Sequence, residues 1–453
     1  MAGPKVVITG GSGCLGSAVI QCLRDRLPDA SLFALDISTP TTDSNNTPRV
    51  EYLQADICDA SAIARIIGQI QPQVIIHTAG LVPSAAKRLG VGDAGLRKVN
   101  IEGTQNVLDA AKTAGSVIAF VHTSSCDVVK GDSWGDLKNV NENITPPQKF
   151  DEVYAETKAV SEHMVLSSAS SYFKTAAIRT YGIIGSNDNN LVPLMAVTPR
   201  RISFGKGTNL YDFTCAENAA LAHVLAVENL LSPSSEGSPS ANGKAFFVTD
   251  QRPIPMRRLM EMIWECLDHG QVQHDSEEIQ GNPIVVPISL AYAIIWIMSL
   301  VAKAFRQPPF VTTDELGAGV SVRYFDNSLA RDVLGYVPRA RLEDSIRDAF
   351  SYLSCGNSDD DRNGWKIIRP LKVLPVDASF PYKLDNQSIA RSHRHEGVAI
   401  VKSSLTREEI SNAPSAINVV AAWYILWHHC FVEVSDGLGD TSAAVPTSTS
   451  ASV

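Results

Sequence analysis

The sequence lacks the features that would mark a secreted, metal-binding or nucleic-acid-binding protein. Its eight cysteines among 453 residues include no C-x-x-C pair, which argues against a zinc site or a disulfide scaffold and favours a reducing compartment. Basic residues are not in surplus, because the formal net charge is −9, so no nucleic-acid partner is expected. The first expected strand begins near Lys5, which leaves no room ahead of it for a cleaved secretory signal. We therefore expect a globular protein without a metal site.

The alternation of strand and helix patterns predicts an α/β protein. From about residue 5 to residue 180 the patterns indicate a doubly wound parallel sheet of the Rossmann type, with helices on both faces. We expect one catalytic unit over residues 1–353, in which residues 4–180 mainly bind a dinucleotide and residues 181–353 form a smaller substrate region. Residues 354–453 have no sustained periodicity and are expected to form a loosely ordered tail.

A glycine-rich turn after the first apolar run is typical of dinucleotide-binding proteins. It contains Gly10, Gly13 and Gly16, whose missing side chains let the backbone turn tightly and approach a pyrophosphate. Cys14 and Leu15 open the helix that follows, whose first N–H groups would face the anion. The spacing G-x-x-G-x-x-G differs from the simple G-x-G-x-x-G form, so an ordinary strand-to-helix turn is the alternative.

An acidic residue at the end of the next apolar run supports the same interpretation. Asp36 lies twenty residues after Gly16, where a carboxylate accepts hydrogen bonds from the adenosine ribose and repels a 2′-phosphate. The expected cofactor is therefore NAD rather than NADP. Further cofactor contacts are expected from residues that follow two later strands, namely Asp56, Ile57, Thr78, Ala79 and Gly80. For Asp56, a role as helix cap before Ala60 is an equal alternative.

Two other polar residues near this edge are interpreted as structural. His77 lies in the expected strand over residues 74–80 and is predicted to be packed near the strand end rather than catalytic. Asn100 lies in a helix expected over residues 94–114.

A hydroxyl pair, a tyrosine and a lysine form the expected catalytic set. Ser124 and Ser125 follow the strand expected over residues 117–122, at the carboxyl edge where ligands bind in doubly wound sheets. Tyr154 and Lys158 are four residues apart, so they share one face of a helix. A nearby ammonium group stabilises phenolate and lowers the tyrosine pKa from about 10, which suits Tyr154 to be the general base for an alcohol. A surface Tyr–Lys pair is the alternative.

These motifs resemble those of extended short-chain dehydrogenases, and among them the 3β-hydroxysteroid dehydrogenase group, which includes the sterol-4α-carboxylate 3-dehydrogenases. The resemblance spans roughly residues 4–353 and includes similar segments at 189–193, 205–219 and 323–336. It implies that Tyr154 is the catalytic base and that Lys158 activates it and contacts the nicotinamide ribose. It also implies that Ser125 orients the substrate, and Ser124 is the alternative residue for that role.

The resemblance also implies a reaction. Hydride would pass from C3 of a 3β-alcohol to NAD⁺, and a carboxylate on C4 of the resulting ketone would be lost as CO₂. Three departures from the group leave the exact substrate open. Tyr181 stands where the group usually has proline, and Cys126 and Cys215 replace larger residues.

Other functions remain open from the sequence. A nucleotide-sugar epimerase or dehydratase would need basic groups for a diphosphate, for which Lys206, Arg200 and Arg201 are the candidates. A reductase of a terpenoid or polyketide ketone would run the same chemistry backwards. A non-enzymatic NAD-binding scaffold would not need the catalytic set.

Two apolar segments bear on membrane association. Residues 284–302 contain no acidic, basic or histidine side chain, and their nineteen residues are near the lower limit for a bilayer span. Membrane attachment and a buried or oligomer-forming helix are the alternatives. Residues 417–432 contain the pair His428 and His429 and are short for a span, so a docking or interfacial helix is an equal alternative. The resemblance implies a sterol-like substrate, the cytoplasmic face of the endoplasmic reticulum membrane, and a homodimer.

Overall fold

The computed structural model describes residues 3–355, except residues 39–49, 133, 197, 199, 201, 233–237, 270–282 and 305–310. Contacts divide the chain into two units, Met1–Ile367 and Ile368–Val453, and every described residue belongs to the first. The surface loop after Asp36, most of the expected tail and the apolar segment 417–432 lie outside the described residues.

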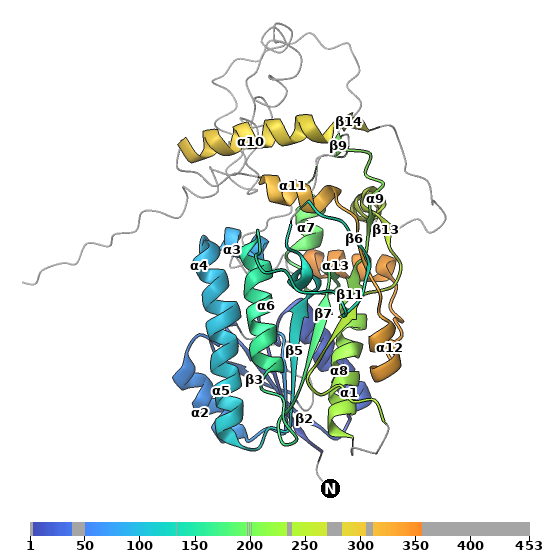
Figure 1. The fold of residues 1–453 in the computed structure, drawn as a ribbon. Helices are drawn as coiled ribbons and strands as arrows, with labels where there is room; N and C mark the ends of the chain where they lie inside the picture. Colours follow the sequence, from blue (N-terminus) through green and yellow to red (C-terminus); the bar gives the residue numbers. More distant parts are fainter. Residues whose placement is uncertain are drawn as a thin grey trace, which may run out of the picture. The chain divides into compact units, whose positions relative to one another are not determined.

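Seven parallel strands form the central sheet (Figure 1), so the predicted doubly wound parallel fold is confirmed. Their order is β12-β7-β5-β4-β1-β2-β3. The strands are β1 (Lys5–Thr9), β2 (Ser31–Asp36), β3 (Val50–Gln54), β4 (Val74–His77), β5 (Ala119–Ser125), β7 (Lys174–Thr180) and β12 (Lys244–Val248). The chain reverses direction across the sheet between β1 and β4, which is where ligands bind in this fold. The last strand, β12, comes from beyond residue 180, so the sheet is not confined to one stretch of sequence.

The sheet is buried on both faces because each strand alternates its side chains between two cores. Val6 and Ile8 of β1 pack with α1 (Cys14–Arg26) and α8 (Ala216–Leu231), whereas Val7 packs with α2 (Ala60–Ile70) and α5 (Thr104–Ala114). Helix α6 (Val153–Leu166) lies on the same face as α5. This three-layer arrangement fixes the carboxyl edge of the sheet.

The helix expected over residues 94–114 is continuous but not uniform. It comprises α4 (Gly92–Arg97), one π-helical stretch η1 (Lys98–Gly103) and α5. A π-helical stretch inside an α-helix turns side chains out of the regular register.

A smaller lobe covers the carboxyl edge of the sheet (Figure 1). Its four-stranded sheet has the order β13-β10-β15-β6. The elements of this lobe are β6 (Leu137–Val140), α7 (Leu191–Ala196), β10 (Leu210–Tyr211), β13 (Ile254–Pro255), α9 (Met256–His269), β15 (Arg323–Phe325) and α13 (Leu342–Cys355). Shorter connecting elements are α3 (Pro83–Arg88), η2 (Cys126–Val129), β8 (Ile183–Ile184), β9 (Ile202–Phe204), β11 (Thr214–Cys215) and α12 (Ser328–Leu334). The lobe has its own apolar core, which begins at Cys126 directly after β5.

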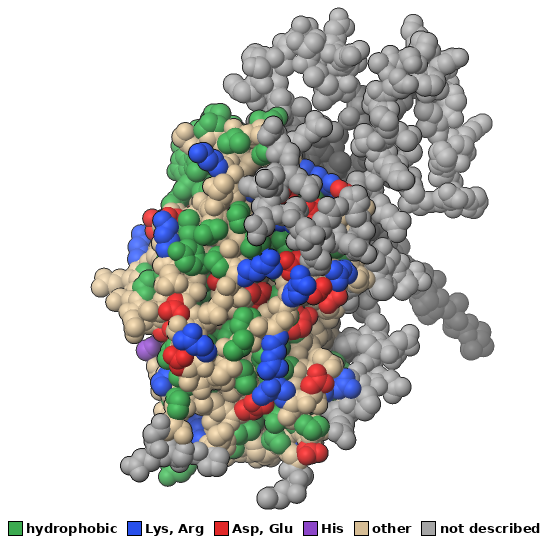
Figure 2. Space-filling model, turned by 90° about the vertical axis from the view of Figure 1, so that its right-hand side faces the viewer, with side chains coloured by type: hydrophobic (Ala, Val, Ile, Leu, Met, Phe, Trp, Pro, Cys, Tyr) green, Lys and Arg blue, Asp and Glu red, His purple; other side chains and the backbone are tan. Residues whose placement is uncertain are grey.

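The apolar segment 284–302 contains a short strand, β14 (Ile284–Val286), and the helix α10 (Ile288–Ala304). One side of α10 packs through Ala291 and Ile295 on α11 (Thr313–Val320). Ile294 and Met298 are half-buried, and seven further large apolar side chains of the helix are exposed, namely Ile288, Leu290, Tyr292, Trp296, Ile297, Leu300 and Val301. Hydrophobic side chains gather at the end of the molecule where α10 lies (Figure 2). Within the described part of the chain, no helix combines the length and apolarity needed to cross a bilayer.

Candidate active site

Three expected catalytic residues come together at the carboxyl edge of the central sheet. Ser125 is the last residue of β5 and is 4% exposed. Helix α6 packs on β5 and carries Tyr154 and Lys158 one turn apart. The Ser125 side chain lies close enough to the Tyr154 phenol to act on its pKa. The site thus holds a hydroxyl, a phenol and an ammonium group on two adjoining elements.

The surroundings of Tyr154 favour its neutral form. Burial is the largest cause and raises the pKa of Tyr154, and the negative charge of Asp127 raises this pKa further. The side chain of Ser125 lowers it. The sequence led us to expect a lowered pKa through Lys158. In the structure burial outweighs any such effect, and the ammonium group turns to the end of β5, where Nζ donates to the Thr123 carbonyl oxygen at 2.6 Å.

Lys158 lies between the ends of β4 and β5. Burial lowers the pKa of Lys158 to about 8, and the nearby charge of Glu162 raises it. A Cβ atom added to Gly80 would lie 3.7 Å from Lys158 Nζ. The glycine therefore leaves room beside the ammonium group at the strand end where cofactor contacts are expected.

The two serines at the end of β5 have different partners, because successive side chains of a strand point to opposite faces. Ser124 Oγ donates to Glu162 Oε2 at 2.6 Å, inside the buried ion pair of Glu162 with Arg179. Ser125 Oγ accepts from the Asp127 backbone N–H at 3.1 Å and faces Tyr154. Ser124 is therefore engaged in the core, whereas the Ser125 hydroxyl lies on the side of Tyr154 and donates to Asp127 Oδ2 at 3.3 Å.

Replacing each serine with alanine separates these two roles. Ser125→Ala is expected to lower kcat by about 100-fold, because it removes a hydrogen-bond donor to the reacting oxygen. Ser124→Ala is expected to lower the free energy of unfolding by about 1–3 kcal/mol, since a buried carboxylate loses a hydrogen bond, and to change kcat little. Steady-state kinetics and urea unfolding measure both. A larger loss of kcat in Ser124→Ala than in Ser125→Ala would reverse the assignment.

The glycine turn fits closely against its neighbours, as a pyrophosphate cradle requires. Gly10 has φ +71°, and a Cβ on it would lie 2.8 Å from the Ala79 backbone nitrogen. A Cβ on Gly16 would lie 2.0 Å from the Gly10 carbonyl oxygen, and one on Gly13 would lie 3.3 Å from the same atom. Only glycine fits at Gly10 and Gly16, so the first turn of α1 can approach a dinucleotide through its backbone.

The side chains of Cys14 and Leu15, which follow Gly13, do not point into the glycine turn where a pyrophosphate would bind. Leu15 is buried in the core between α1 and the sheet, and Cys14 is half-buried with a thiol whose pKa burial raises. Their contribution to a dinucleotide is limited to the N–H groups at the helix N-terminus.

Asp36 ties the glycine turn to the end of β2. Its Oδ2 accepts from the Ser12 backbone N–H at 3.0 Å, and its Oδ1 accepts from the Ser38 backbone N–H at 3.3 Å. An ionised carboxylate offers about four acceptor positions, so capacity remains for ribose hydroxyls.

Asp56 and Ile57 lie after β3. Asp56 is exposed, and its Oδ1 accepts from the Cys58 N–H at 2.8 Å. The helix cap of α2 is Asp59, whose side chain accepts from the Ala62 N–H, so the alternative role of Asp56 as that cap is wrong. Ile57 is buried in the core beneath α5. Of the two, only Asp56 presents its side chain to solvent.

Thr78, Ala79 and Gly80 leave β4 beside the glycine turn. Thr78 Oγ1 donates to the Thr9 carbonyl oxygen at 2.6 Å, and the Ala79 N–H donates to Thr9 Oγ1 at 3.3 Å. This network holds the ends of β1 and β4 together. These residues therefore offer a cofactor mainly backbone and small side chains.

The structural interpretation of His77 and Asn100 is confirmed. His77 is fully buried and its ring nitrogens bond to Thr9 and Thr104 hydroxyls. Asn100, in η1, accepts from the Leu81 N–H at 2.7 Å and donates to the Leu81 carbonyl oxygen at 2.9 Å. It thereby fixes the segment that follows Gly80.

The substrate side of the site contains residues that sequence reasoning did not select. Asp127 lies two residues after Ser125, and its charge acts on Tyr154, Tyr181 and Tyr211. The sequence could have indicated Asp127, because it lies in the run Ser-Ser-Cys-Asp at the end of a strand. Arg323, fully buried on β15, gave no local signal, because it lies far along the chain.

The three departures from the family pattern are buried. Tyr181 and Tyr211 stack at 5.2 Å between ring centroids, and their hydroxyls lie 2.6 Å apart. Cys126 Sγ donates to the Arg179 carbonyl oxygen at 3.3 Å, and Cys215 Sγ donates to Asp250 at 2.8 Å. Tyr181 thus fills space next to the catalytic centre, whereas the two cysteines pack in the core.

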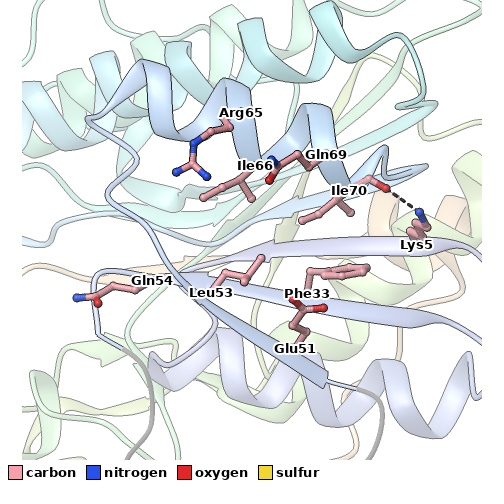
Figure 3. Close-up of a pocket in the computed structure, with 9 residues that line it drawn as sticks. All are labelled: Lys5, Phe33, Glu51, Leu53, Gln54, Arg65, Ile66, Gln69 and Ile70. Atoms are coloured by element: carbon pink, nitrogen blue, oxygen red, sulfur yellow. Dashed lines mark hydrogen bonds between the residues drawn. The ribbon is translucent and has the colours of Figure 1, made fainter.

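Other features of the described part of the chain do not suggest a second centre. A depression over β3 and α2 is lined by residues such as Phe33, Arg65 and Gln69 and contains none of the catalytic set (Figure 3). No three histidine, cysteine or acidic side chains among the described residues are grouped as a metal site would need. His428 and His429 lie outside the described residues.

Comparisons with known proteins agree with this geometry. Residues 7–276 match the 3-beta hydroxysteroid dehydrogenase/isomerase family. The sterol-4-alpha-carboxylate 3-dehydrogenase, decarboxylating, of Schizosaccharomyces pombe is 33% identical over 353 residues, covering 77% of this chain and 97% of that protein. The protein of the same name from Mus musculus is 28% identical, covering 76% of this chain and 89% of that protein.

Solved structures share the fold. UDP-glucose 4-epimerase from Thermus thermophilus, in complex with NAD, has a TM-score of 0.54 at 18% identity and covers 78% of this chain and 99% of its own. The protein gox2253 has a TM-score of 0.58 at 20% identity, with the same coverage. At these identities the likeness concerns the fold alone.

The catalytic set and the glycine cradle are those of an oxidoreductase that uses a nicotinamide cofactor. The match over residues 7–276 and the 33% identity to a relative that is covered almost end to end agree with them. The chain belongs to the 3-beta hydroxysteroid dehydrogenase/isomerase family.

Proposed function

We propose that this protein oxidises the 3β-hydroxyl of a sterol or steroid-like substrate to the 3-ketone, with NAD⁺ as the hydride acceptor. The observation that carries the proposal is the grouping of Ser125, Tyr154 and Lys158 at the carboxyl edge of the sheet. The names of the family and of the similar proteins support the 3β-hydroxyl as the reacting group.

Each catalytic side chain has a distinct task in this reaction. Ser125 donates a hydrogen bond to the C3 oxygen and holds it beside Tyr154, which removes the hydroxyl proton. Lys158 supplies positive charge behind the phenol, which favours phenolate. The oxidised nicotinamide, when bound, accepts the hydride and adds a positive charge that favours phenolate as well.

We propose further that the substrate carries a carboxylate on C4. A ketone at C3 makes that group a β-keto acid, whose loss of CO₂ leaves an enolate that the ketone stabilises. The decarboxylating dehydrogenases to which this chain is similar support this choice.

Asp36 supports NAD rather than NADP. Its carboxylate holds the glycine turn at 3.0 Å from the Ser12 nitrogen, so a 2′-phosphate would meet a negative charge there. The neighbouring described residues Ile37 and Ser38 supply no cation.

The alternative of a nucleotide-sugar enzyme has less support. Arg200 is paired with Asp268, and Lys206 is exposed on the turn between β9 and β10. Arg201 lies outside the described residues. The described candidates therefore provide little positive charge for a diphosphate.

A direct assay tests the substrate and the cofactor together. The full-length chain, extracted in detergent, is given NAD⁺ or NADP⁺ with a 3β-hydroxysterol, its 4α-carboxylate or a UDP-sugar. We expect NADH with the sterols, CO₂ in addition with the carboxylate, and much weaker turnover with NADP⁺. Turnover of UDP-sugars without turnover of any sterol would contradict the proposal.

We also propose that the protein works as a homodimer at a membrane surface, on the cytoplasmic face of the endoplasmic reticulum. The support is the exposed apolar face of α10, including Trp296 and Ile297, with Lys303 at its end. A helix that exposes apolar side chains can lie against a membrane surface, from which a lipid-dissolved sterol could enter the site. Flotation with sterol-containing vesicles measures membrane binding, and the sedimentation mass in detergent measures dimerisation.

A further inference from the structure

One carboxyl group, that of Asp127, lies next to Ser125 and Tyr154 and has no part in hydride transfer. Asp127 is half-buried on η2, the 3-10 turn directly after β5. Ser125 Oγ donates to Asp127 Oδ2 at 3.3 Å, and the Asp127 backbone N–H donates to Ser125 Oγ at 3.1 Å. Because the Ser125 side chain also acts on the neighbouring Tyr154 phenol, the three side chains follow one another from Tyr154 to Asp127.

The charges around Asp127 come from the end of its own turn and from two other elements. Lys130, 4% exposed, pairs with Glu152 at 2.6 Å, just ahead of α6, and Arg323 approaches from β15. Burial raises the pKa of Asp127 and Glu152 raises it, whereas Lys130 and Arg323 lower it. The net direction is upward, which favours a carboxyl group that can donate a proton.

The proposed reaction releases a proton at one atom and requires one at the next. Oxidation at C3 takes the hydroxyl proton from the substrate. Loss of CO₂ from C4 leaves an enolate whose C4 must then gain a proton. One proton is released and one consumed, so the overall conversion of the hydroxy acid and NAD⁺ to ketone, CO₂ and NADH exchanges no net proton with solvent.

We propose that Asp127 is the acid that protonates C4, and that it regains its proton through Ser125 from Tyr154. When CO₂ leaves, the electron pair of the broken C4–carboxylate bond forms the C3–C4 double bond of the enolate. That double bond then takes the proton of the Asp127 carboxyl group, which forms the C4–H bond and restores the C3 carbonyl. Ser125 Oγ passes a proton to the Asp127 carboxylate and receives the one that Tyr154 took from the C3 hydroxyl.

In the proposed complex Asp127 would lie close to C4. The C3 oxygen is held by Ser125, C4 is bonded to C3, and Asp127 is the carboxyl group hydrogen-bonded to the same serine. Lys130 and Arg323 offset the negative charge that a substrate carboxylate would bring near Asp127. The inference rests on the proposed function, since a substrate without a C4 carboxylate needs no such acid.

The face of C4 that receives the proton tests the proposal. The full-length enzyme is run in D₂O with NAD⁺ and a 3β-hydroxysterol-4α-carboxylate, and NMR locates deuterium at C4 of the ketone. A fixed acid delivers deuterium to one face, so we expect one epimer from the wild-type enzyme. Both epimers in equal amounts from the wild-type enzyme would overturn the role of Asp127 without any variant.

Variants then assign that acid. Asp127→Asn is expected to yield both epimers and to lower the rate of C4 protonation about 100-fold more than the rate of NADH formation. Asp127→Glu should restore one epimer. Asp151→Asn, which removes an exposed carboxylate three residues before Tyr154, is the matched control and should keep one epimer. A single epimer from Asp127→Asn overturns this inference alone, whereas no NADH from any sterol with the wild-type enzyme overturns the proposed function with it.

Discussion

Replacing Tyr154 with phenylalanine is expected to lower kcat about 1,000-fold while NAD⁺ binding stays measurable. The variant keeps the ring and its packing on α6 but removes the hydroxyl that accepts the substrate proton, and such proton transfer contributes about 10²–10⁴-fold. Stopped-flow measurement of NADH formation gives the rate, and titration of the cofactor by protein fluorescence gives its affinity.

The surroundings of Tyr154 make this a demanding test of the mechanism. Burial and the charge of Asp127 both raise the pKa of Tyr154, so the residue is a poor base until positive charge is brought to it. Lys158→Met should therefore lower kcat as well, through a higher pKa of Tyr154, and shift the rising limb of the pH profile to higher pH. Activity retained in Tyr154→Phe would remove the residue from its role.

The carboxyl edge of the sheet was predictable because its determinants are local. The apolar runs of β1, β2 and β4 are short and fully or largely buried, and each ends in small or polar residues that define one edge. The strand that ends in the catalytic serine continues three residues past its expected end. Ser125 pairs in register with Thr180 of β7, and a pairing with a distant strand has no signature in the local sequence.

The chemistry around the catalytic pair was only partly predictable. Tyr154 and Lys158 are close in sequence, so helical spacing alone puts them together. The pKa of Asp127 depends first on burial and then on the charges of Lys130, Glu152 and Arg323, of which the last two are brought near it by three-dimensional packing. Asn100 likewise depends on the π-helical stretch, which apolar periodicity does not distinguish from an ordinary helix.

Removing one partner of the ion pair Glu162 and Arg179 is expected to have the largest effect on stability. Both side chains are 8% exposed, and two hydrogen bonds of 2.9 and 2.7 Å join them beneath β5 and β7. Arg179→Met leaves the Glu162 carboxylate buried, with Ser124 as the one donor that remains among the described residues, which costs about 3–5 kcal/mol of unfolding free energy. Urea unfolding followed by circular dichroism measures the loss.

The same helix provides the matched control for that experiment. Glu156 of α6 forms a two-bond ion pair with Arg97, but this pair is exposed, so solvent replaces the lost partner and Arg97→Met should shift the urea midpoint little. The double variant Glu162→Gln with Arg179→Met should recover part of the loss, because no buried charge then remains without its partner. Equal destabilisation by Arg179→Met and Arg97→Met would contradict the argument, since burial is the difference between the two pairs. Because Ser124 bonds to Glu162 and Ser125 follows it on β5, loss of the pair should also lower kcat by loosening the strand that presents the catalytic hydroxyl.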